Sequence, residues 1–352
     1  MGELDGRTFL VTGGNTGIGR ATARALAQRG GRVYLTSRSW AKGEEAVASI
    51  KASSGNGSVW FLPLDLADLE SVRACASDFL DRGEPLHVLV NNAGVAGQRR
   101  LTRQGFELMF GVNHLGHFAL TSALLGRLAD SAPSRVVTVA SDAHYSAKGI
   151  DFEALRRPAR GITGLPEYAV SKLGNVLFSA ELARRTSGTG VTTYALHPGV
   201  VASDIWRRVP WPVRPLITRR MLSVTEGAAT SLYCATSPDV ARESGRFYDN
   251  CAERAASPVA TPELAAELWR RSESWTAAYL AGGETGARAL SRPVPGYGEH
   301  RGAKLADASI AAARFGAAAR NTAGSLADAS IAAARFGAAA RNTAGSLEDA
   351  SQ

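Results

Sequence analysis

The chain has 352 residues, of which 45% are hydrophobic and 20% are charged, and its formal net charge is +8 at pH 7. This length is enough for one large or two ordinary domains with a substantial core, and the composition is ordinary for a globular protein. The basic charge does not indicate a nucleic-acid-binding protein, because no run of Lys and Arg is interleaved with aromatic residues and no nucleic-acid-binding motif occurs.

From residue 7 to about 200, short apolar runs alternate with amphipathic segments. The runs are "TFLVTG", "RVYLTS", "SVWFLPLDL", "HVLVNNAG", "SRVVTVAS" and "TTYALHPG", and the segments between them include "GRATARALAQRG" and "LESVRACASDFLDRG". Continuous apolar strands separated by helices predict a parallel sheet covered on both faces, which is a doubly wound α/β fold. Residues 203 to 290 have a mainly helical and loop-like pattern, apart from a short strand near "GRFYDN".

A glycine-rich turn, "VTGGNTGIG", lies between the first predicted strand and the first predicted helix. Glycine permits a positive φ and lets a pyrophosphate approach the backbone, while the following helix start offers free N–H groups and a positive dipole end. The turn therefore predicts a dinucleotide site. Its residues are Gly13, Asn15, Thr16, Gly17, Ile18 and Gly19.

The end of the second predicted strand, "YLTSRSW", indicates which dinucleotide is bound. An NAD site places Asp or Glu there for the ribose hydroxyls, whereas this chain has Ser37 and Arg38, with Arg20 and Lys42 nearby. A guanidinium can bind a 2′-phosphate through paired hydrogen bonds. We therefore expect NADP(H) to be favoured over NAD(H), the alternative being that Arg38 is a solvated loop residue.

Further motifs follow the later strands in order: "DL" at 65–66, "NNAG" at 91–94, "VNHLGHF" at 112–118, "VTVASDAH" at 137–144, "YAVSK" at 168–172 and "HPGVVAS" at 197–203. Tyr168 and Lys172 lie one helical turn apart on one face, although that spacing alone is also common among surface residues. In this order the set resembles the short-chain dehydrogenase/reductase family over about residues 5–260. The wording "ELARRTSGTGVTTYALHPG" and the insert between Ser141 and Tyr168 resemble its retinol-dehydrogenase-like branch.

The resemblance implies a Rossmann-type doubly wound fold with a central, mostly parallel seven-stranded sheet flanked by helices. It also implies an oxidoreductase that acts on CH–OH donors. The family's catalytic positions fall on Asn113, Ser141, Tyr168 and Lys172. A tyrosine with a pKa near 10 is a poor base at neutral pH, so the charges of Lys172 and the oxidised nicotinamide are expected to favour its phenolate. Ser141 would polarise the substrate oxygen, and Asn113 would hold a water that connects Lys172 to solvent.

The same resemblance implies further cofactor contacts. Asp65 and Leu66 are expected at the adenine, and Pro198 and Val201 at the nicotinamide, with Ser203 where the family usually has threonine. The expected contacts on the adenosine side, together with the two catalytic residues that also touch the cofactor, are Asn91, Ala93, Gly94, Tyr168 and Lys172. The other titratable residues of these motifs are interpreted as structural or substrate-lining, namely His144, Tyr145 and His197.

The resemblance places one domain at residues 1–300, with a substrate lid at 203–225. The lid sequence "DIWRRVPWPVRPLITRRML" predicts a cover for an apolar substrate; a surface loop and a peripheral membrane contact are the alternatives. We therefore expect hydride transfer on a lipophilic alcohol, aldehyde or ketone. Two alternatives stay open: a catalytically silent NADP(H)-sensing protein, and an enzyme recruited to a scaffold by its tail. A homodimer is also open, since relatives often pair.

The last segment repeats itself. "LADASIAAARFGAAARNTAGS" occupies 305–325 and recurs unchanged at 326–346. The period suits three heptads, but Leu305, Ile310 and Phe315 are five residues apart and do not form an apolar stripe on a helix. The pattern favours a weakly helical or disordered tail over 301–352, the alternative being a docking module.

The cysteines and the first residues indicate where the protein works. Cys75, Cys234 and Cys251 are far apart and match no metal-ligand spacing, so we expect reduced thiols and no bound metal. No basic segment followed by an apolar core and a cleavage site begins the chain, and no apolar run reaches about 18 residues. These patterns predict a cytoplasmic protein without a signal peptide or a membrane span.

Overall fold

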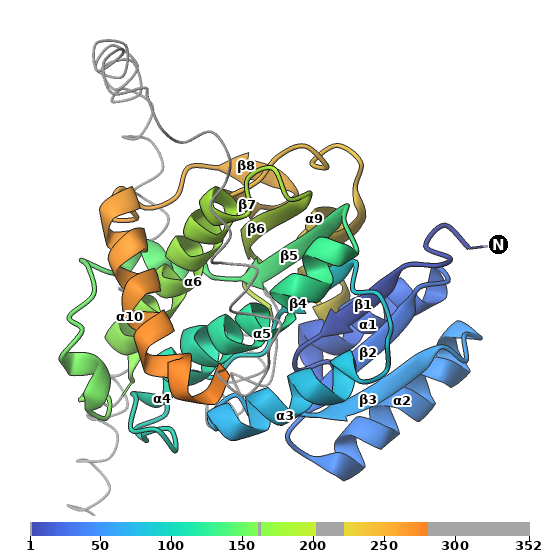
Figure 1. Cartoon of the computed structure of the whole chain (residues 1–352), viewed down its shortest axis with the longest axis horizontal. Coiled ribbons are helices and arrows are strands. Elements are labelled where there is room, and N and C mark those ends of the chain that lie inside the picture. Colours follow the sequence, from blue (N-terminus) through green and yellow to red (C-terminus); the bar gives the residue numbers. More distant parts are fainter. Residues whose placement is uncertain (1, 161–162, 202–221, 281–352) are drawn as a thin grey trace, which may run out of the picture. The chain divides into compact units, whose positions relative to one another are not determined.

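A twisted sheet runs through the middle of the protein, whose computed structural model describes residues 2–160, 163–201 and 222–280 (Figure 1). Its strand order is β3-β2-β1-β4-β5-β6-β7-β8, and all neighbours pair in parallel except β7 and β8, which are antiparallel. The strands are β1 (Thr8–Val11), β2 (Arg32–Ser37), β3 (Val59–Pro63), β4 (Val88–Asn91), β5 (Ser134–Val139), β6 (Val191–His197), β7 (Arg246–Asp249) and β8 (Ala252–Arg254).

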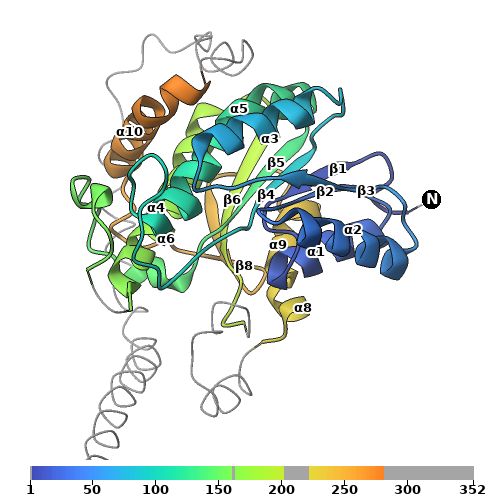
Figure 2. The same cartoon turned by 90° about the horizontal axis from the view of Figure 1, so that it is seen from below.

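Helices cover both faces of the sheet (Figure 2). One face carries α1 (Gly17–Gln28), α2 (Trp40–Ser54), α8 (Val224–Gly227) and α9 (Ala229–Thr236). The other carries α3 (Leu69–Leu80), α4 (Leu108–Phe110), the π-helical turn η1 (Gly111–Leu115), α5 (Gly116–Asp130), α6 (Leu165–Arg185) and α10 (Pro262–Leu280). Two short 3-10 helices, η2 (Asp142–Ser146) and η3 (Ala154–Arg156), follow β5.

Side chains of the strands alternate between two apolar cores, one on each face. Along β1, Leu10 packs with the core of α3 and α5, whereas Phe9 and Val11 pack with the core of α1 and α2. Fully burying one such side chain contributes about 1.5–3 kcal/mol. Because both faces of the sheet are buried, the strands have continuous apolar sequences. This arrangement confirms the predicted α/β class.

The sheet has one more strand than predicted, because the chain turns back after β7. The turn is Asn250–Cys251, whose φ values are 49° and 60°. Two consecutive residues with positive φ are typical of a type I′ hairpin, whose twist matches that of the flanking strands. The sequence did not reveal β8 because the strand has three residues and its turn is not the usual Asn-Gly.

One helical stretch, Leu108–Asp130, is long and apolar enough to cross a membrane, although the sequence pattern predicts no span. Its apolar window is 94% buried inside the protein. Most of these side chains therefore already pack against the sheet and the neighbouring helices α3 and α6. Length and composition are weak evidence for a span in a helix buried in this way.

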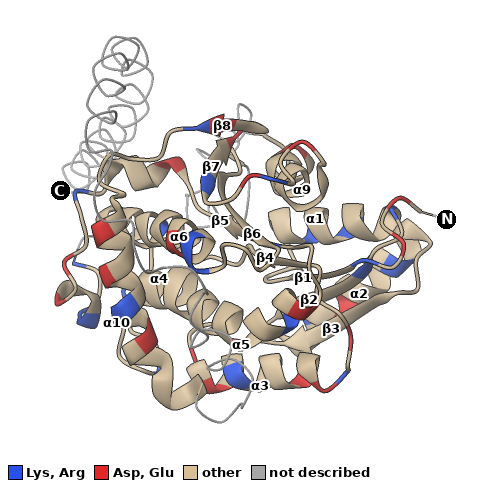
Figure 3. Cartoon of the chain, turned by 45° about the horizontal axis from the view of Figure 1, so that its top comes forward, with Lys and Arg blue, Asp and Glu red and all other residues tan. Residues whose placement is uncertain are grey.

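Charged residues of both signs are interspersed over the described elements (Figure 3). In that view the basic residues do not gather into a stripe along any one helix. The three cysteines are free thiols, and no group of three His, Cys, Asp or Glu residues within 2–160, 163–201 and 222–280 could hold a metal ion.

Two predicted segments fall wholly or largely outside the described residues. Of the predicted lid at 203–225, only 222–225 are described, and Ser203 lies outside. The predicted tail at 301–352, with both repeats, lies outside as well. All described residues belong to one compact unit, Met1–Arg292.

Candidate active site

The carboxyl ends of the parallel strands share one edge of the sheet, where the chain connections change direction between β1 and β4. This reversal is the place where doubly wound folds bind their ligands. A cavity of about 1000 Å³, called the edge cavity below, opens there. Of the predicted cofactor residues, it is lined by Gly13, Asn15, Thr16, Gly17, Ile18, Gly19, Arg38, Asp65, Leu66, Ala93, Gly94, Tyr168, Lys172 and Pro198.

Two glycines of the turn after β1 have conformations that other residues adopt with strain. Gly13 has a φ of 63°, and a Cβ there would lie 3.0 Å from the Cβ of Ala93. Gly17 has a φ of 55° with open space around it, and it begins α1. The first turn of α1 contains no acidic side chain. Its N–H groups can therefore receive an anion in the edge cavity.

Thr12 fixes this turn to the segment that follows β4. Its hydroxyl accepts hydrogen bonds from the backbone N–H groups of Asn92 and Ala93, both at 2.9 Å. The Asn92 amide in turn donates to the Thr12 carbonyl at 2.8 Å. The two motifs that line the cofactor end are thus one hydrogen-bonded unit.

Two predicted cofactor contacts do not line the edge cavity. The side chain of Asn91 is buried and donates to the Thr121 hydroxyl at 3.0 Å, and Asn92 lines the cavity in its place. Side chains of neighbouring residues at a strand end point to opposite sides of the sheet. This alternation could have indicated that only one of the two asparagines faces the cavity. Val201 is buried and lies, like Ile18, against Gly227. It contributes to the wall behind the turn.

The adenosine end of the cavity is mostly basic. Arg20, Arg38 and Lys42 line it, together with the acidic residues Glu45 and Asp65. Arg38 is exposed and follows directly after β2, as the sequence predicts. No carboxylate occupies the end of β2, where Ser37, Arg38 and Ser39 stand.

The predicted catalytic residues Ser141, Tyr168 and Lys172 meet where β5 ends against α6. The Ser141 hydroxyl lies beside the Tyr168 hydroxyl and interacts with it. The Lys172 Nζ atom lies 5.7 Å from the centre of the Tyr168 ring and donates to the Val139 carbonyl at 2.8 Å. Tyr168 and Lys172 therefore line one end of the edge cavity, and Ser141 lies beside Tyr168 without being part of the lining formed by the described residues.

Burial changes the expected electrostatics of this group. It raises the pKa of Tyr168, and this exceeds the opposite influence of Ser141. It also lowers the pKa of Lys172 to about 7, because the ammonium is removed from water. The sequence predicts that the charges of Lys172 and the oxidised nicotinamide together favour the phenolate. Within the protein alone, burial is the largest influence on the pKa of Tyr168.

Asn113 lies in the π-helical turn η1, a feature frequent at functional sites. Its Oδ1 accepts from the Val95 N–H at 2.8 Å, and its Nδ2 donates to the Val95 carbonyl and to Ser171. Both Nδ2 hydrogens are therefore used in holding the loop after β4 against α6, while Oδ1 keeps one acceptor position. A water held by Asn113, as the sequence predicts, would donate to Oδ1 or to the backbone carbonyl.

His117 was not singled out by the sequence pattern, yet it connects both ends of the site. Its Nε2 lies 2.9 Å from the Thr12 hydroxyl, and its Nδ1 lies 3.0 Å from the Asn113 carbonyl. Burial lowers the pKa of His117 to about 4, so the ring is neutral at neutral pH. It therefore acts as a fixed hydrogen-bonded link between the glycine-rich turn and η1.

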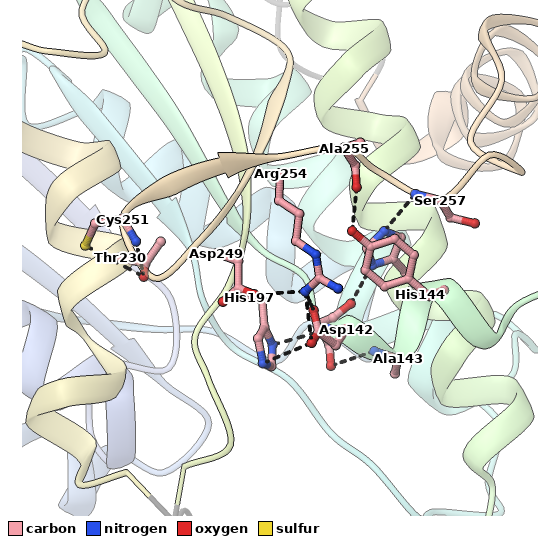
Figure 4. A network of polar contacts seen from close by, with 12 residues as sticks. Asp142, Ala143, His144, His197, Thr230, Asp249, Cys251, Arg254, Ala255 and Ser257 are labelled. Carbon is pink, nitrogen blue, oxygen red and sulfur yellow. Dashed lines mark hydrogen bonds and ion pairs between the residues drawn. The ribbon is translucent and has the colours of Figure 1, made fainter. Parts of the chain in front are cut away.

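The remaining titratable residues of the motifs have mainly structural contacts (Figure 4). His144 is buried, with its Nδ1 2.7 Å from the Ser141 carbonyl, and its Nε2 accepts from the Ser257 N–H at 3.1 Å. Tyr145 donates to the Ala255 carbonyl. His197 accepts from the backbone N–H of Asp142 at 3.3 Å. None of the three lines the edge cavity as formed by the described residues.

Sequence comparisons agree with this architecture. The short chain dehydrogenase family matches residues 7–154. The chain is 46% identical to human retinol dehydrogenase 12 over 277 residues, which cover 77% of this chain and 86% of that protein. It is also 46% identical over 280 residues to human dehydrogenase/reductase SDR family member 13, covering 78% and 74% of the two chains.

Solved structures show the same fold. An uncharacterized protein from Mycobacterium paratuberculosis superposes with a TM-score of 0.63 at 34% identity, covering 79% of this chain and 98% of its own. A short chain dehydrogenase from Burkholderia cenocepacia in complex with NADP superposes with a TM-score of 0.57 at 25% identity, covering 70% and 96%.

Proposed function

The chain belongs to the short-chain dehydrogenase/reductase family, in its retinol-dehydrogenase-like branch, and from this premise we propose that it interconverts a lipophilic alcohol and its carbonyl compound with NADP(H). As an oxidoreductase of this family it acts on CH–OH donors. One observation carries the finer proposal. Tyr168, beside Ser141 and one helical turn from Lys172, shares a cavity with the glycine-rich turn and with Arg38.

The edge cavity suits a dinucleotide. Its volume of about 1000 Å³ is at the upper end of ordinary ligand sites. The absence of a side chain at Gly13 and the open space at Gly17 leave the backbone accessible to a pyrophosphate at the start of α1. When bound, NADP(H) supplies or accepts the hydride and, in its oxidised form, adds a positive charge.

Three basic side chains support a preference for NADP(H). Arg38, Arg20 and Lys42 surround the end of β2, where a 2′-phosphate is bound by enzymes that use this cofactor. Glu45 and Asp65 in the same lining oppose them, but three cations outnumber these two carboxylates. The Burkholderia cenocepacia dehydrogenase, which shares the fold at 25% identity, has NADP bound.

Tyr168 is proposed to exchange the proton. In reduction its hydroxyl gives a proton to the substrate oxygen, which the Ser141 hydroxyl also contacts; in oxidation the phenolate takes the hydroxyl proton back. Burial raises the pKa of Tyr168, so the phenolate needs nearby positive charge. A protonated Lys172 provides part of that charge from the next turn of α6.

Exposed apolar side chains near this end support a lipophilic substrate. Leu165, Val200 and Leu222 are 60%, 56% and 39% exposed, and the first two lie three and two residues from Tyr168 and Pro198 in the chain. A Cβ on Gly199 would lie 2.4 Å from a Leu222 methyl group, and the Leu222 N–H donates to the Val200 carbonyl at 2.9 Å, so Leu222 packs against this segment. The branch name suggests retinoids as one class of candidate.

A substrate and cofactor matrix tests the proposal. A series of aldehydes and ketones from short aliphatic compounds to retinal is reduced with NADPH and with NADH, and kcat/KM is measured for each pair. We expect kcat/KM to rise with apolar chain length and to be higher with NADPH. A flat chain-length profile contradicts the lipophilic substrate, and a preference for NADH contradicts the cofactor assignment.

The proposal also includes a cytoplasmic location and a homodimer. Cell fractionation and co-sedimentation with anionic vesicles test the first, because a peripheral membrane protein pellets with the vesicles. Light scattering at several protein concentrations tests the second.

A further inference from the structure

Arg254, at the end of β8, binds two carboxylates that come from different parts of the sheet. Its Nη1 atom lies 3.1 Å from Asp142 Oδ1, after β5, and 2.9 Å from Asp249 Oδ2, at the end of β7. The guanidinium also lies 4.7 Å from the centre of the Tyr145 ring. Asp142, Asp249, Arg254 and His197 are called the Arg254 cluster below (Figure 4).

Two members of the Arg254 cluster are next to residues of the candidate active site in the chain. Asp142 follows Ser141, and His197 precedes Pro198, which lines the edge cavity. The backbone N–H of Asp142 donates to His197 Nδ1 at 3.3 Å, which ties the end of β5 to the end of β6. A displacement of Asp142 would therefore move the backbone of Ser141.

This tie requires a neutral imidazole. His197 Nδ1 accepts a hydrogen bond only while it carries no proton, and its Nε2 lies 3.8 Å from Asp142 Oδ2. If His197 Nδ1 were protonated, its N–H would face the backbone N–H of Asp142, and two donors cannot form a hydrogen bond. The bond between β5 and β6 would then be lost.

The charges that face His197 come from four elements. Burial lowers the pKa of His197; Asp142 and Asp249 raise it, and Arg254 and Lys172 lower it. His144, two residues after Asp142, also interacts electrostatically with His197. Removing the guanidinium would leave two carboxylates to attract a proton onto the ring.

We propose that Arg254 is a positioning residue for the oxidoreductase reaction, fixing through Asp142 and His197 the two backbone segments that carry Ser141 and Pro198. Arg254 does not line the edge cavity as formed by the described residues, so it acts through its partners. This inference rests on the proposed function for its kinetic test, which measures kcat against pH. Its second test measures the pKa of His197 by NMR and does not require activity.

The kinetic test compares Arg254→Gln with wild type in NADPH-dependent carbonyl reduction from about pH 6 to 8.5. Loss of the guanidinium should move the acid limb of the kcat profile to higher pH. We expect kcat about threefold or more below wild type near pH 6 and close to wild type near pH 8, with KM for NADPH nearly unchanged. Circular dichroism and the Tm verify that the variant folds.

Two variants control this experiment. All hydrogen bonds of Arg254 with the two carboxylates use the single nitrogen Nη1, so Arg254→Lys keeps the charge and should restore the profile. Arg246→Gln removes an arginine of the same hairpin that pairs with Glu243 and Glu253 instead. It should leave the profile unchanged. A loss in Arg254→Gln that is equal at every pH would overturn the proposal in favour of a purely structural role.

An NMR titration gives the second readout. The chain has six histidines, and the His197 signal is assigned by its absence in His197→Asn. The His197 pKa should be higher in Arg254→Gln than in wild type and should fall again in Arg254→Gln/Asp249→Asn. An unchanged His197 pKa would refute the inference even if the enzyme is active. If wild type reduces no carbonyl while the pKa shifts as expected, the proposed function is wrong and the Arg254 cluster still operates.

Discussion

The two ends of the edge cavity are built in different ways. At the cofactor end, the glycine-rich turn and the segment after β4 hold each other through backbone groups and the side chains of Thr12 and Asn92. At the catalytic end, side chains from α6, β5, β6 and β8 converge, and some partners are far apart in the chain; Asp142 and Arg254 are 112 residues apart. The first end depends mainly on backbone conformation, and the second depends on side chains that meet there.

This difference changes how each end can fail. At the cofactor end the key property is a conformation, such as the positive φ of Gly13. At the catalytic end it is protonation, because burial raises the pKa of Tyr168 and lowers the pKa of Lys172. Substitutions at the first end should mainly alter cofactor binding. Substitutions at the second should mainly alter kcat and its dependence on pH.

The largest expected effect is at the catalytic end. Tyr168→Phe removes the hydroxyl beside Ser141 and keeps the buried ring, so kcat for carbonyl reduction should fall by about 10²–10⁴-fold. The affinity for NADPH, measured by fluorescence titration, should change little. Tyr233→Phe, on α9 and away from the edge cavity, is the control. If Tyr168→Phe keeps the wild-type kcat, proton transfer does not depend on this phenol.

The cofactor end should respond in the opposite way. Gly13→Ala places a methyl group about 3.0 Å from Ala93 at a φ of 63°, so the turn must shift. We expect the Kd for NADPH to rise about tenfold or more, with a backbone cost of about 1–2 kcal/mol. Gly55→Ala has a similar φ of 68° in open space and isolates the backbone cost. Equal Kd values in the two variants would contradict the role of the close contact.

The comparison also explains how much of the protein could be predicted from its sequence. Strands, helices and the glycine-rich turn depend on neighbouring residues, so the α/β class and the positions along the chain of the strands up to β7 follow from local patterns. The missed strand β8 depends on an Asn-Cys turn without a usual sequence signal. Asn91 and Asn92 differ only in the side to which each points at the end of β4.

Properties of the catalytic end could not be predicted from local patterns. The set Ser141, Tyr168 and Lys172 was found through a family resemblance, and the structure brings these side chains together. Their pKa shifts depend on how much water the fold excludes, which spacing does not indicate. His117 and Arg254 have their partners in distant motifs, so only the packed structure relates them to the site.

A smaller effect is expected at the adenosine end, where a charge acts across solvent. Arg38 is exposed, so Arg38→Gln should fold normally. The kcat/KM with NADPH should fall about tenfold while the value with NADH stays nearly constant, since one charge-assisted contact is lost. Arg24→Gln, an exposed residue of α1 outside the edge cavity, should change neither value. Equal losses with both cofactors would show that Arg38 does not recognise a 2′-phosphate.

The last expected effect concerns the free energy of unfolding and its change per pH unit. A buried lysine with a lowered pKa should make this free energy depend on pH, whereas a surface lysine should not. Burial lowers the pKa of Lys172 to about 7, whereas the unfolded chain has an ordinary lysine pKa near 10.4. Between these values the unfolded state binds more protons than the folded state, so this group makes the protein more stable as pH rises. Lys172→Met should remove that dependence, up to about 1 kcal/mol per pH unit, and should be more stable than wild type at pH near 7.

Urea unfolding from about pH 7 to 9.5 measures the free energy of unfolding and its dependence on pH. Lys51→Met, on the last turn of α2, is the surface control. Parallel stability profiles for wild type and Lys172→Met would mean that the amine keeps an ordinary pKa, and the catalytic end would then be wetter than its packing indicates.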